Sequence, residues 1–191
     1  NHISPLKLQM AIEQSCNPYF WNVYRSIIYN SEYGSVKVAY NTWRDHVMSL
    51  GFGNKFDTDI PFELGGNIPT GEYYDKIYSE GHWNALTIRS LAIGQGEILV
   101  TPLQLANLSA VIANKGYYYP PHLVRAVGTK ENYIQDFTKK QTTTIDALYF
   151  DVVQEAMLDV FEGDHGTARW SRLPGVEICG KTGTVHNPHG E

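Results

Sequence analysis

The sequence predicts an α+β fold, because helical patterns come first, irregular segments and further helices follow, and a β-rich segment comes last. The clearest helix lies in the capped apolar run "TPLQLANLSAVIANKG", and the β-rich segment is "VEICGKTGTV", residues 176–185. The chain has 191 residues, 42% of them hydrophobic, which is enough for a sizeable core. Without an internal repeat or a linker, we expect one domain or a large piece of one.

Charge and cysteine content exclude several classes of function. The net charge is −5 and the 15 basic residues are scattered, which is not the pattern of a nucleic-acid binder. No apolar run approaches the roughly 20 residues that cross a bilayer. Cys16 and Cys179 have no metal-ligand spacing. The chain begins at Asn1 and ends just after a strand-like segment, so we expect it to be a portion of a longer protein, with any membrane anchor outside it.

Two N-cap residues, each followed by proline, predict helices near the start of the chain. Ser4 begins a helix that runs through Gln14, and Asn17 begins another that continues to residue 28. Ser15 and Cys16 remain between the helices as a tight corner.

Later helices are indicated by the same signals. Ser35 caps a third helix that Gly51 ends, Thr101 caps the helix that Gly116 ends, and an amphipathic helix covers residues 145–161. Residues 51–90 are rich in glycine, proline and tyrosine and are predicted to be long surface connections, which often form binding walls. The alternating segment "HLVRAVGT", residues 122–129, is typical of a strand.

Two short motifs have the residue types that chemistry needs. Ser15 and Asn17 place a hydroxyl and an amide on one corner, as either a plain helix connection or a catalytic cleft would. In "GKTGT", Lys181 supplies a positive charge, and Thr182 and Thr184 share one face by the strand period of two. Such an edge suits an extended substrate that ends in a carboxylate, although a lysine on an exposed edge strand also protects against aggregation.

Together the motifs resemble the penicillin-binding protein and serine β-lactamase superfamily. Residues 15–17 match its S-x-N motif and residues 181–183 its K-T-G motif, with 163 residues between them in the expected order. "LQMAIEQSCNPYF" is similar to the helix-loop-helix around S-x-N, and "GDHGTA" to the segment before K-T-G. "AIGQGEILVTPLQLANLSAVIANKG" is most similar to elongation-type class B transpeptidases of the penicillin-binding protein 2 group.

The resemblance implies a fold and a division of the chain. The expected fold is penicillin-binding protein transpeptidase-like, a helical subdomain plus an antiparallel sheet, here truncated at both ends. Residues 1–191 would form part of one transpeptidase domain. The S-x-N helical region would cover 4–50, irregular cleft walls 51–100, helices and strands 101–175, and the K-T-G strand 176–185.

The resemblance also implies catalytic roles for three residues. Ser15 would relay protons between a general-base lysine and the attacking or leaving group. Asn17 would hydrogen-bond the amide of the acyl donor. Lys181 would shape the electrostatic field at the nucleophile.

Substrate-binding roles are implied for the residues that follow Lys181. Thr182 and Thr184 would receive the terminal carboxylate of a penicillin or a D-Ala-D-Ala stem, and Gly183 would keep that side open. The backbone N–H of Thr184 would form half of an oxyanion hole.

The catalytic nucleophile of the family is the one site residue that we do not expect to find in this chain. It lies in an S-x-x-K motif, and the only such motif here is Ser4-Pro5-Leu6-Lys7. A helix from Ser4 to Gln14 would separate Ser4 from the corner by about 15 Å, too far for one hydrogen-bonded site. We therefore expect the nucleophile to lie outside this chain and the chain alone to be inactive.

The implied activity is that of a serine-type peptidoglycan D,D-transpeptidase, which crosslinks stem peptides through an acyl-serine in cell-wall synthesis and is a target of β-lactams. Glycosyltransferase and elongation-complex proteins are the implied partners. The implied location is the extracytoplasmic, periplasmic side of the cytoplasmic membrane, with no nucleic acid and no cofactor. The alternatives are a β-lactamase or sensor of the same superfamily and a non-catalytic recognition or scaffold module.

Other residues are interpreted as structural. Three histidines, His165, His186 and His189, are expected to be solvated, so we expect no metal. Cys16 is expected to be a small buried packing residue. The aromatic residues of 72–83 either line a groove or cover the core, and the second interpretation is preferred. Asp57 and Asp59 are interpreted as turn residues.

Overall fold

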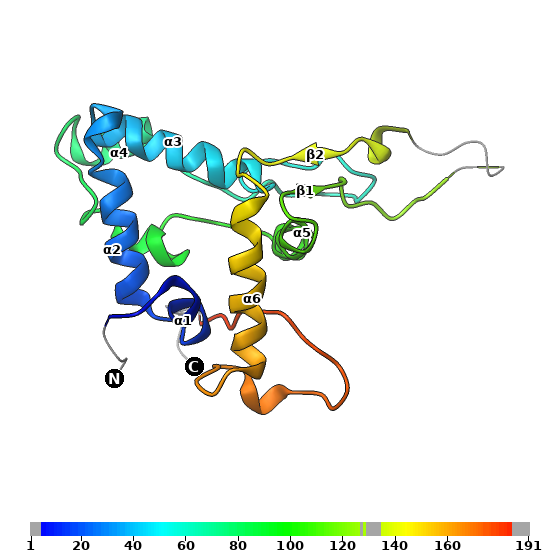
Figure 1. Ribbon diagram of the computed structural model, residues 1–191. Coiled ribbons are helices and arrows are strands. Elements are labelled where there is room, and N and C mark those ends of the chain that lie inside the picture. The colour runs from blue at the N-terminus through cyan, green and yellow to red at the C-terminus, as the bar shows by residue number, and fades with distance from the viewer. Residues whose placement is uncertain (1–4, 127, 129–134, 185–191) are drawn as a thin grey trace, which may run out of the picture.

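The computed structural model describes residues 5–126, 128 and 135–184, and most of its regular structure is helical (Figure 1). The main elements of this part of the chain are α1 (Leu8–Glu13), α2 (Asn17–Ile28), α3 (Val36–Ser49), α4 (Gly71–Tyr78), α5 (Pro102–Ala113), β1 (Tyr117–Tyr118), β2 (Gln141–Thr142) and α6 (Leu148–Glu162). Short 3₁₀ helices are η1 (Ser31–Tyr33), η2 (Arg89–Ile93), η3 (Gln135–Thr138) and η4 (Arg169–Ser171).

Three of the helices form an open frame, in which α2 and α6 run roughly side by side and α3 crosses above them (Figure 1). In Figure 1, α3 runs across the top, α2 and α6 descend from it, and α1 lies at their lower ends. Helix α6 packs against both α1 and α5, and α2 packs against α3 and η2. Strands β1 and β2 pair antiparallel, with Tyr117 opposite Thr142 and Tyr118 opposite Gln141. Strand β1 packs against α5. The frame thus brings the first helix of the chain against the last one.

An aromatic core holds α2, α3, α4 and η2 together. Tyr40 makes edge-to-face contacts with Tyr74 and Trp83, at centroid distances of 5.4 and 5.7 Å. Burial raises the pKa of Tyr40 to about 12, so the ring stays neutral at physiological pH. The buried cluster comprises Tyr24, Ile28, Tyr40, Tyr74, Trp83, Ala85, Ile88 and Leu91. A smaller cluster of Ile12, Ala156 and Val160 joins α1 to α6.

Several predicted helix signals are confirmed. The Ser35 hydroxyl accepts a hydrogen bond from the N–H of Val38 and caps α3. Thr101 and Gln104 form a reciprocal capping box at the start of α5. Helix α6 ends at Glu162 with Gly163 as its C-cap.

The predicted starts of the first two helices are wrong in their details. Helix α1 begins at Leu8 rather than at Ser4, which lies outside the described residues. Leu8 is the first residue of this segment that packs on the α6 cluster, and a short helix forms where packing supports it. Helix α2 includes Asn17, so Cys16 is its N-cap, without a side-chain cap bond.

Residues 51–90 contain more structure than predicted. Helix α4 and part of η2 lie in this range, where only irregular connections were expected. The hydroxyl of Thr70 caps α4 by accepting from the N–H of Tyr73. Of the aromatic residues of 72–83, Tyr74 and Trp83 are buried in the core as predicted, whereas Tyr73 and Tyr78 are exposed. The core therefore depends on a region whose composition resembles loops.

The strands predicted at 122–129 and 176–185 do not form in the described residues of those ranges. The backbone donors of Leu123 and Val124 instead bind the Asp59 carboxylate, and these bonds hold the pKa of Asp59 below its usual range. Near the K-T-G motif, the N–H of Gly180 donates to the carbonyl of Met157 in α6. A strand needs a neighbouring strand to complete its hydrogen bonds, and within the described residues these donors bind other groups.

The two core tyrosines Tyr24 and Tyr40 give a matched stability test. The Tyr40 hydroxyl donates to the carbonyl of Pro69 at 2.7 Å, whereas the buried Tyr24 hydroxyl has no hydrogen-bond partner among the described residues. We expect Tyr40→Phe to lower the free energy of unfolding by about 1–2 kcal/mol, and Tyr24→Phe to leave it unchanged or raise it. Chemical denaturation of both variants measures this difference. An equal loss in the two would contradict the hydrogen-bond assignment.

Candidate active site

The corner between α1 and α2 has a strained and well-fixed backbone. Ser15 has a φ of 53°, in the left-handed region that residues other than glycine seldom adopt. The N–H of Cys16 donates to the carbonyl of Ala11 at 2.9 Å, which closes the end of α1. The Cys16 side chain is buried, as expected for a packing residue. The corner therefore fixes the direction of the Ser15 side chain.

Lys181 reaches this corner from the other end of the chain. Its Nζ lies 2.8 Å from the Oγ of Ser15, although the two residues are 166 positions apart in the sequence. The same ammonium lies 3.1 Å from the carbonyl oxygen of Thr182 and 3.3 Å from its Oγ1. The S-x-N and K-T-G motifs thus meet through direct side-chain contact.

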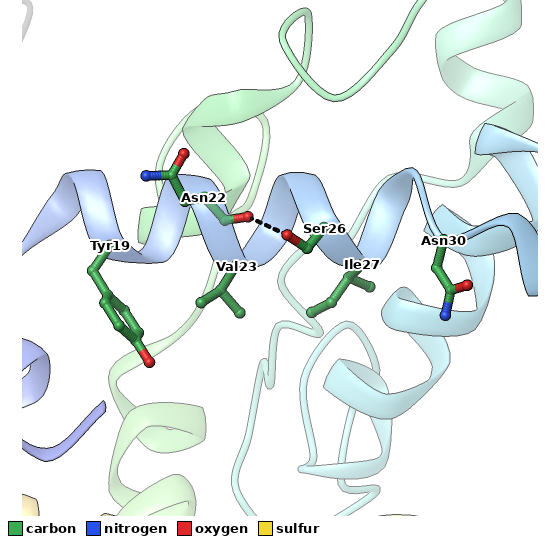
Figure 2. Close-up of a pocket in the computed structure, with 6 residues that line it drawn as sticks. All are labelled: Tyr19, Asn22, Val23, Ser26, Ile27 and Asn30. Carbon is green, nitrogen blue, oxygen red and sulfur yellow. Dashed lines mark hydrogen bonds between the residues drawn. The ribbon is translucent and has the colours of Figure 1, made fainter. Parts of the chain in front are cut away.

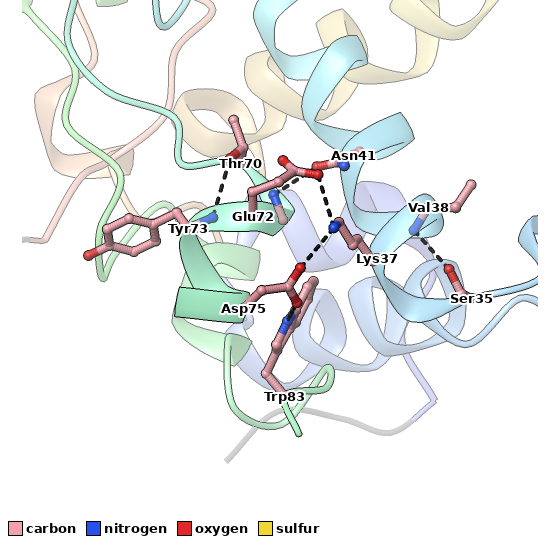
Figure 3. Close-up of polar contacts among 10 residues, drawn as sticks. Ser35, Lys37, Val38, Asn41, Thr70, Glu72, Tyr73, Asp75 and Trp83 are labelled. Carbon is pink, nitrogen blue, oxygen red and sulfur yellow. Dashed lines mark hydrogen bonds and ion pairs between the residues drawn. The ribbon is translucent and has the colours of Figure 1, made fainter. Parts of the chain in front are cut away.

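Two lysines of the chain have opposite electrostatic environments. Figure 3 shows Lys37 of α3 between Glu72 and Asp75 of α4, and the hydrogen bond to Asp75 is the main reason that its pKa rises to about 12. Asp75 also accepts from the indole N–H of Trp83 at 2.7 Å. Lys181 has no ion pair with a described carboxylate, and partial burial lowers its pKa. Lys37 connects two helices, whereas Lys181 remains able to bind an anion or exchange a proton.

The other predicted site residues lie beside this contact. Asn17 is exposed at the start of α2. Within the described residues, its carboxamide makes no hydrogen bond to Lys181. A Cβ placed on Gly183 would meet nothing within 4 Å, so the surroundings of Gly183 are open. Thr184 is exposed. The structure brings Ser15, Lys181 and Thr182 into contact and leaves Asn17 and Thr184 without a direct bond to them.

Two further residues at the site were not predicted. The Oγ1 of Thr167 lies 2.9 Å from the Oγ1 of Thr182, and the Nε2 of Gln95 lies 3.5 Å from the carbonyl oxygen of Thr184. Gln95 stands between Gly94 and Gly96, whose φ values of 71° and 81° form a tight turn after η2. The sequence signal was present in "GQG", because paired glycines around a polar residue indicate such a turn.

A hollow lies on the exposed face of α2. Figure 2 shows Tyr19, Val23 and Ile27 projecting from the same side of the helix. Asn22, Ser26 and Asn30 complete the lining, and the Ser26 hydroxyl donates to the carbonyl of Asn22. This hollow contains no cation and none of the motif residues, so it is not the catalytic candidate.

Histidine and acidic side chains do not form a metal centre in the described residues. In that part of the chain, no three His, Cys, Asp or Glu side chains are arranged to hold a metal ion. The backbone N–H of His165 donates to Glu13. His186 and His189 lie outside the described residues.

The strain at Ser15 predicts a difference between two variants that both lack its hydroxyl. Glycine adopts a φ of 53° freely, whereas alanine keeps the steric cost of the left-handed region. We expect Ser15→Gly to be more stable than Ser15→Ala by about 1 kcal/mol. Denaturant titrations of both variants measure the difference. Greater stability of the alanine variant would contradict the left-handed corner.

The partial burial of Lys181 predicts a lowered pKa for its side chain. Burial disfavours the ammonium, so the folded protein should lose this proton at a lower pH than the ordinary lysine pKa of about 10.4. Over that interval the unfolded chain binds more protons, and this residue makes the free energy of unfolding rise with pH. An NMR titration of the Lys181 side chain measures the pKa. A value at or above the ordinary one would contradict the desolvation.

Comparisons with known proteins agree with this geometry. Residues 1–187 match the penicillin binding protein transpeptidase domain. The peptidoglycan D,D-transpeptidase MrdA of Acinetobacter baumannii is 33% identical over 94% of this chain and 25% of that protein. MrdA of Haemophilus influenzae is 29% identical over 93% of this chain and 26% of that protein.

A solved structure shares the fold as well. Penicillin-binding protein PBP2 of Helicobacter pylori, in complex with MreC, is 25% identical with a TM-score of 0.73, and the match covers 95% of this chain and 31% of that one. The chain spans about a quarter of the length of the curated relatives it matches. Because the family match covers nearly all of its residues, the chain belongs to the penicillin-binding protein transpeptidase domain family.

Proposed function

We propose that the protein containing this chain is a peptidoglycan D,D-transpeptidase of the elongation type, which crosslinks stem peptides through an acyl-serine and is acylated by β-lactams. The observation that carries the proposal is the 2.8 Å contact between Lys181 Nζ and Ser15 Oγ. The relatives named D,D-transpeptidases support the same activity. Acyl transfer needs a proton relay, a carboxylate site and fixed hydrogen-bond donors, and residues of this chain supply these groups.

Ser15 and Lys181 form the proposed proton relay. A lysine whose pKa is lowered by burial gives up a proton more readily than an exposed lysine, and the Ser15 hydroxyl both donates and accepts. The pair can therefore carry a proton to a leaving amine and take one from an incoming amine. Asn17, exposed beside Ser15, would donate its N–H groups to the amide carbonyl of the acyl donor.

The K-T-G segment forms the proposed substrate site. The Lys181 ammonium lies 3.3 Å from the Thr182 hydroxyl, and the Thr184 hydroxyl would join them in binding the terminal carboxylate of a stem peptide or penicillin. The open surroundings of Gly183 leave room for an extended peptide. The backbone N–H of Thr184 would donate to the developing oxyanion, a bond whose loss typically costs about 3 kcal/mol of transition-state stabilisation.

The nucleophile is proposed to lie outside this chain. Residues 1–191 would then be part of a transpeptidase domain, with S-x-N and K-T-G walls supplied here and an S-x-x-K helix supplied by another segment. The share of the relatives' length that the chain spans, about a quarter, supports this division. Ser4, in the only S-x-x-K of the chain, precedes the start of α1 and lies outside the described residues.

Partners and location are part of the same proposal. Within the described residues, every helix is too short or too polar to cross a membrane. We propose that a separate segment anchors the protein in the cytoplasmic membrane, with this domain on the extracytoplasmic side. The complex of Helicobacter pylori PBP2 with MreC supports elongation-complex proteins as partners.

A fluorescent penicillin tests the proposed function. The full-length protein should form a labelled band that survives denaturation, because acylation forms a covalent ester. Lys181→Ala and Asn17→Ala should lower the acylation rate about 100-fold, the range for loss of one stabilising donor. Lys76→Ala, at an exposed lysine of α4, is the matched control and should acylate like the unsubstituted protein.

The outcomes of this experiment separate the two parts of the proposal. Failure of the full-length protein to form a labelled band would refute the transpeptidase assignment. The 191-residue chain alone should remain unlabelled. A covalent band on that chain would instead restore Ser4 as the nucleophile.

A further inference from the structure

Glu13 is a buried acid that the proposed chemistry does not use. Its exposed fraction is 7%, and acidic side chains are almost never so buried without a partner. Its partners are backbone groups. Glu13 Oε1 accepts from the N–H of His165 at 3.0 Å, and its backbone carbonyl accepts from the N–H of Thr167 at 3.3 Å. Both partners belong to the loop 163–168, more than 150 positions away.

The loop 163–168 folds tightly over the end of α6. The N–H of Gly163 donates to the backbone carbonyl of Asp159, and the N–H of Ala168 donates to the backbone carbonyl of Val160, both at 2.9 Å. A Cβ on Gly163 would collide with the Glu13 carboxylate, and a Cβ on Gly166 would collide with backbone oxygens of α6. The loop is therefore in close contact with both Glu13 and the end of α6.

The loop continues into the candidate active site. Thr167 contacts Thr182 through their hydroxyls at 2.9 Å, and Lys181 contacts both the carbonyl and the hydroxyl of Thr182. Lys181 in turn contacts Ser15, two positions after Glu13. The contacts therefore connect Glu13 to Ser15 in series, through the loop 163–168, Thr182 and Lys181.

We propose that Glu13 is a positioning residue for acyl transfer, which holds the loop 163–168 so that Thr167 fixes Thr182 and Lys181 against Ser15. The inference rests on the proposed function for its kinetic consequence. Its physical basis is the pair of hydrogen bonds that the loop donates to Glu13, one to the carboxylate and one to the backbone carbonyl. Without the carboxylate, the amide of His165 loses its acceptor, and of this pair the loop keeps only the 3.3 Å bond from the Thr167 N–H to the Glu13 carbonyl.

Kinetics of the full-length protein with a fluorescent penicillin test the proposal. Glu13→Ala should lower the acylation rate constant about 10–100-fold with a smaller change in the dissociation constant of the non-covalent complex, since misplacement by about 1 Å costs that much in rate. Glu13→Gln keeps the Oε1 acceptor and should recover the rate to within about threefold.

Gln9→Ala is the matched structural control. Gln9 donates to the Asp159 carboxylate at 2.6 Å across the same α1–α6 contact and, within the described residues, makes no hydrogen bond to the loop 163–168. This variant should lose thermal stability and keep the acylation rate constant of the unsubstituted protein. An equal loss of stability in Glu13→Ala without a change in rate would overturn the proposal. A Glu13→Gln variant as slow as Glu13→Ala would also overturn it.

Amide hydrogen exchange gives a readout independent of activity. The amide of His165 should exchange faster in Glu13→Ala than in Gln9→Ala, because only the first substitution removes its acceptor. The Thr167 amide keeps its acceptor, the backbone carbonyl of Glu13, in both variants. Unchanged exchange at His165 would refute the positioning role. If the unsubstituted protein failed to acylate, the proposed function would fall, while exchange would still decide whether Glu13 holds the loop.

Discussion

The contact between α1 and α6 is the constraint on which the candidate site depends. Ile12 of α1 packs on Ala156 and Val160 of α6, and this apolar contact brings chain ends together that would otherwise be independent. Helix α1 leads directly to Ser15, and α6 leads to Lys181 through residues 163–180, which include η4. The hydrogen bond between them is a consequence of this packing, because a single exposed hydrogen bond contributes too little to close a loop of more than 150 residues.

The aromatic core has a different role, which is to orient α2 and the turn that follows η2. Tyr24 of α2 and Leu91 of η2 belong to one buried cluster, so the start of α2 and the turn at Gln95 are both fixed by it. Gln95 therefore reaches the site from the aromatic core, whereas α2, which carries Asn17, also packs on the smaller cluster through Phe20. The site lies where the two packed units of the fold meet, and each unit positions different groups.

The sequence predicted the parts of the fold that local chemistry determines. The caps at Ser35 and Thr101 were recognisable because a side-chain oxygen three residues before a backbone N–H is sufficient to start a helix. Helix α4 was missed although Thr70 caps it in the same way, because the helix has only 8 residues and lies in a segment whose glycine, proline and tyrosine content is typical of loops. The K-T-G strand was predicted from β-propensity, yet a strand also requires a partner, which propensity cannot provide. The meeting of Ser15 and Lys181 was expected from the family resemblance rather than from any local pattern.

The site retains two features that oppose stability, and both concern the residues proposed for proton transfer. Ser15 keeps a left-handed backbone, which costs of order 1–3 kcal/mol for a residue other than glycine. Lys181 keeps an ammonium that is partly removed from water without a described carboxylate to neutralise it. Lys37 shows that the same chain can satisfy a lysine fully, with two acidic neighbours. A lysine without a described carboxylate partner, beside a strained serine, is therefore a local property of this site, maintained by the surrounding packing. It leaves the ammonium available for a substrate carboxylate or a proton.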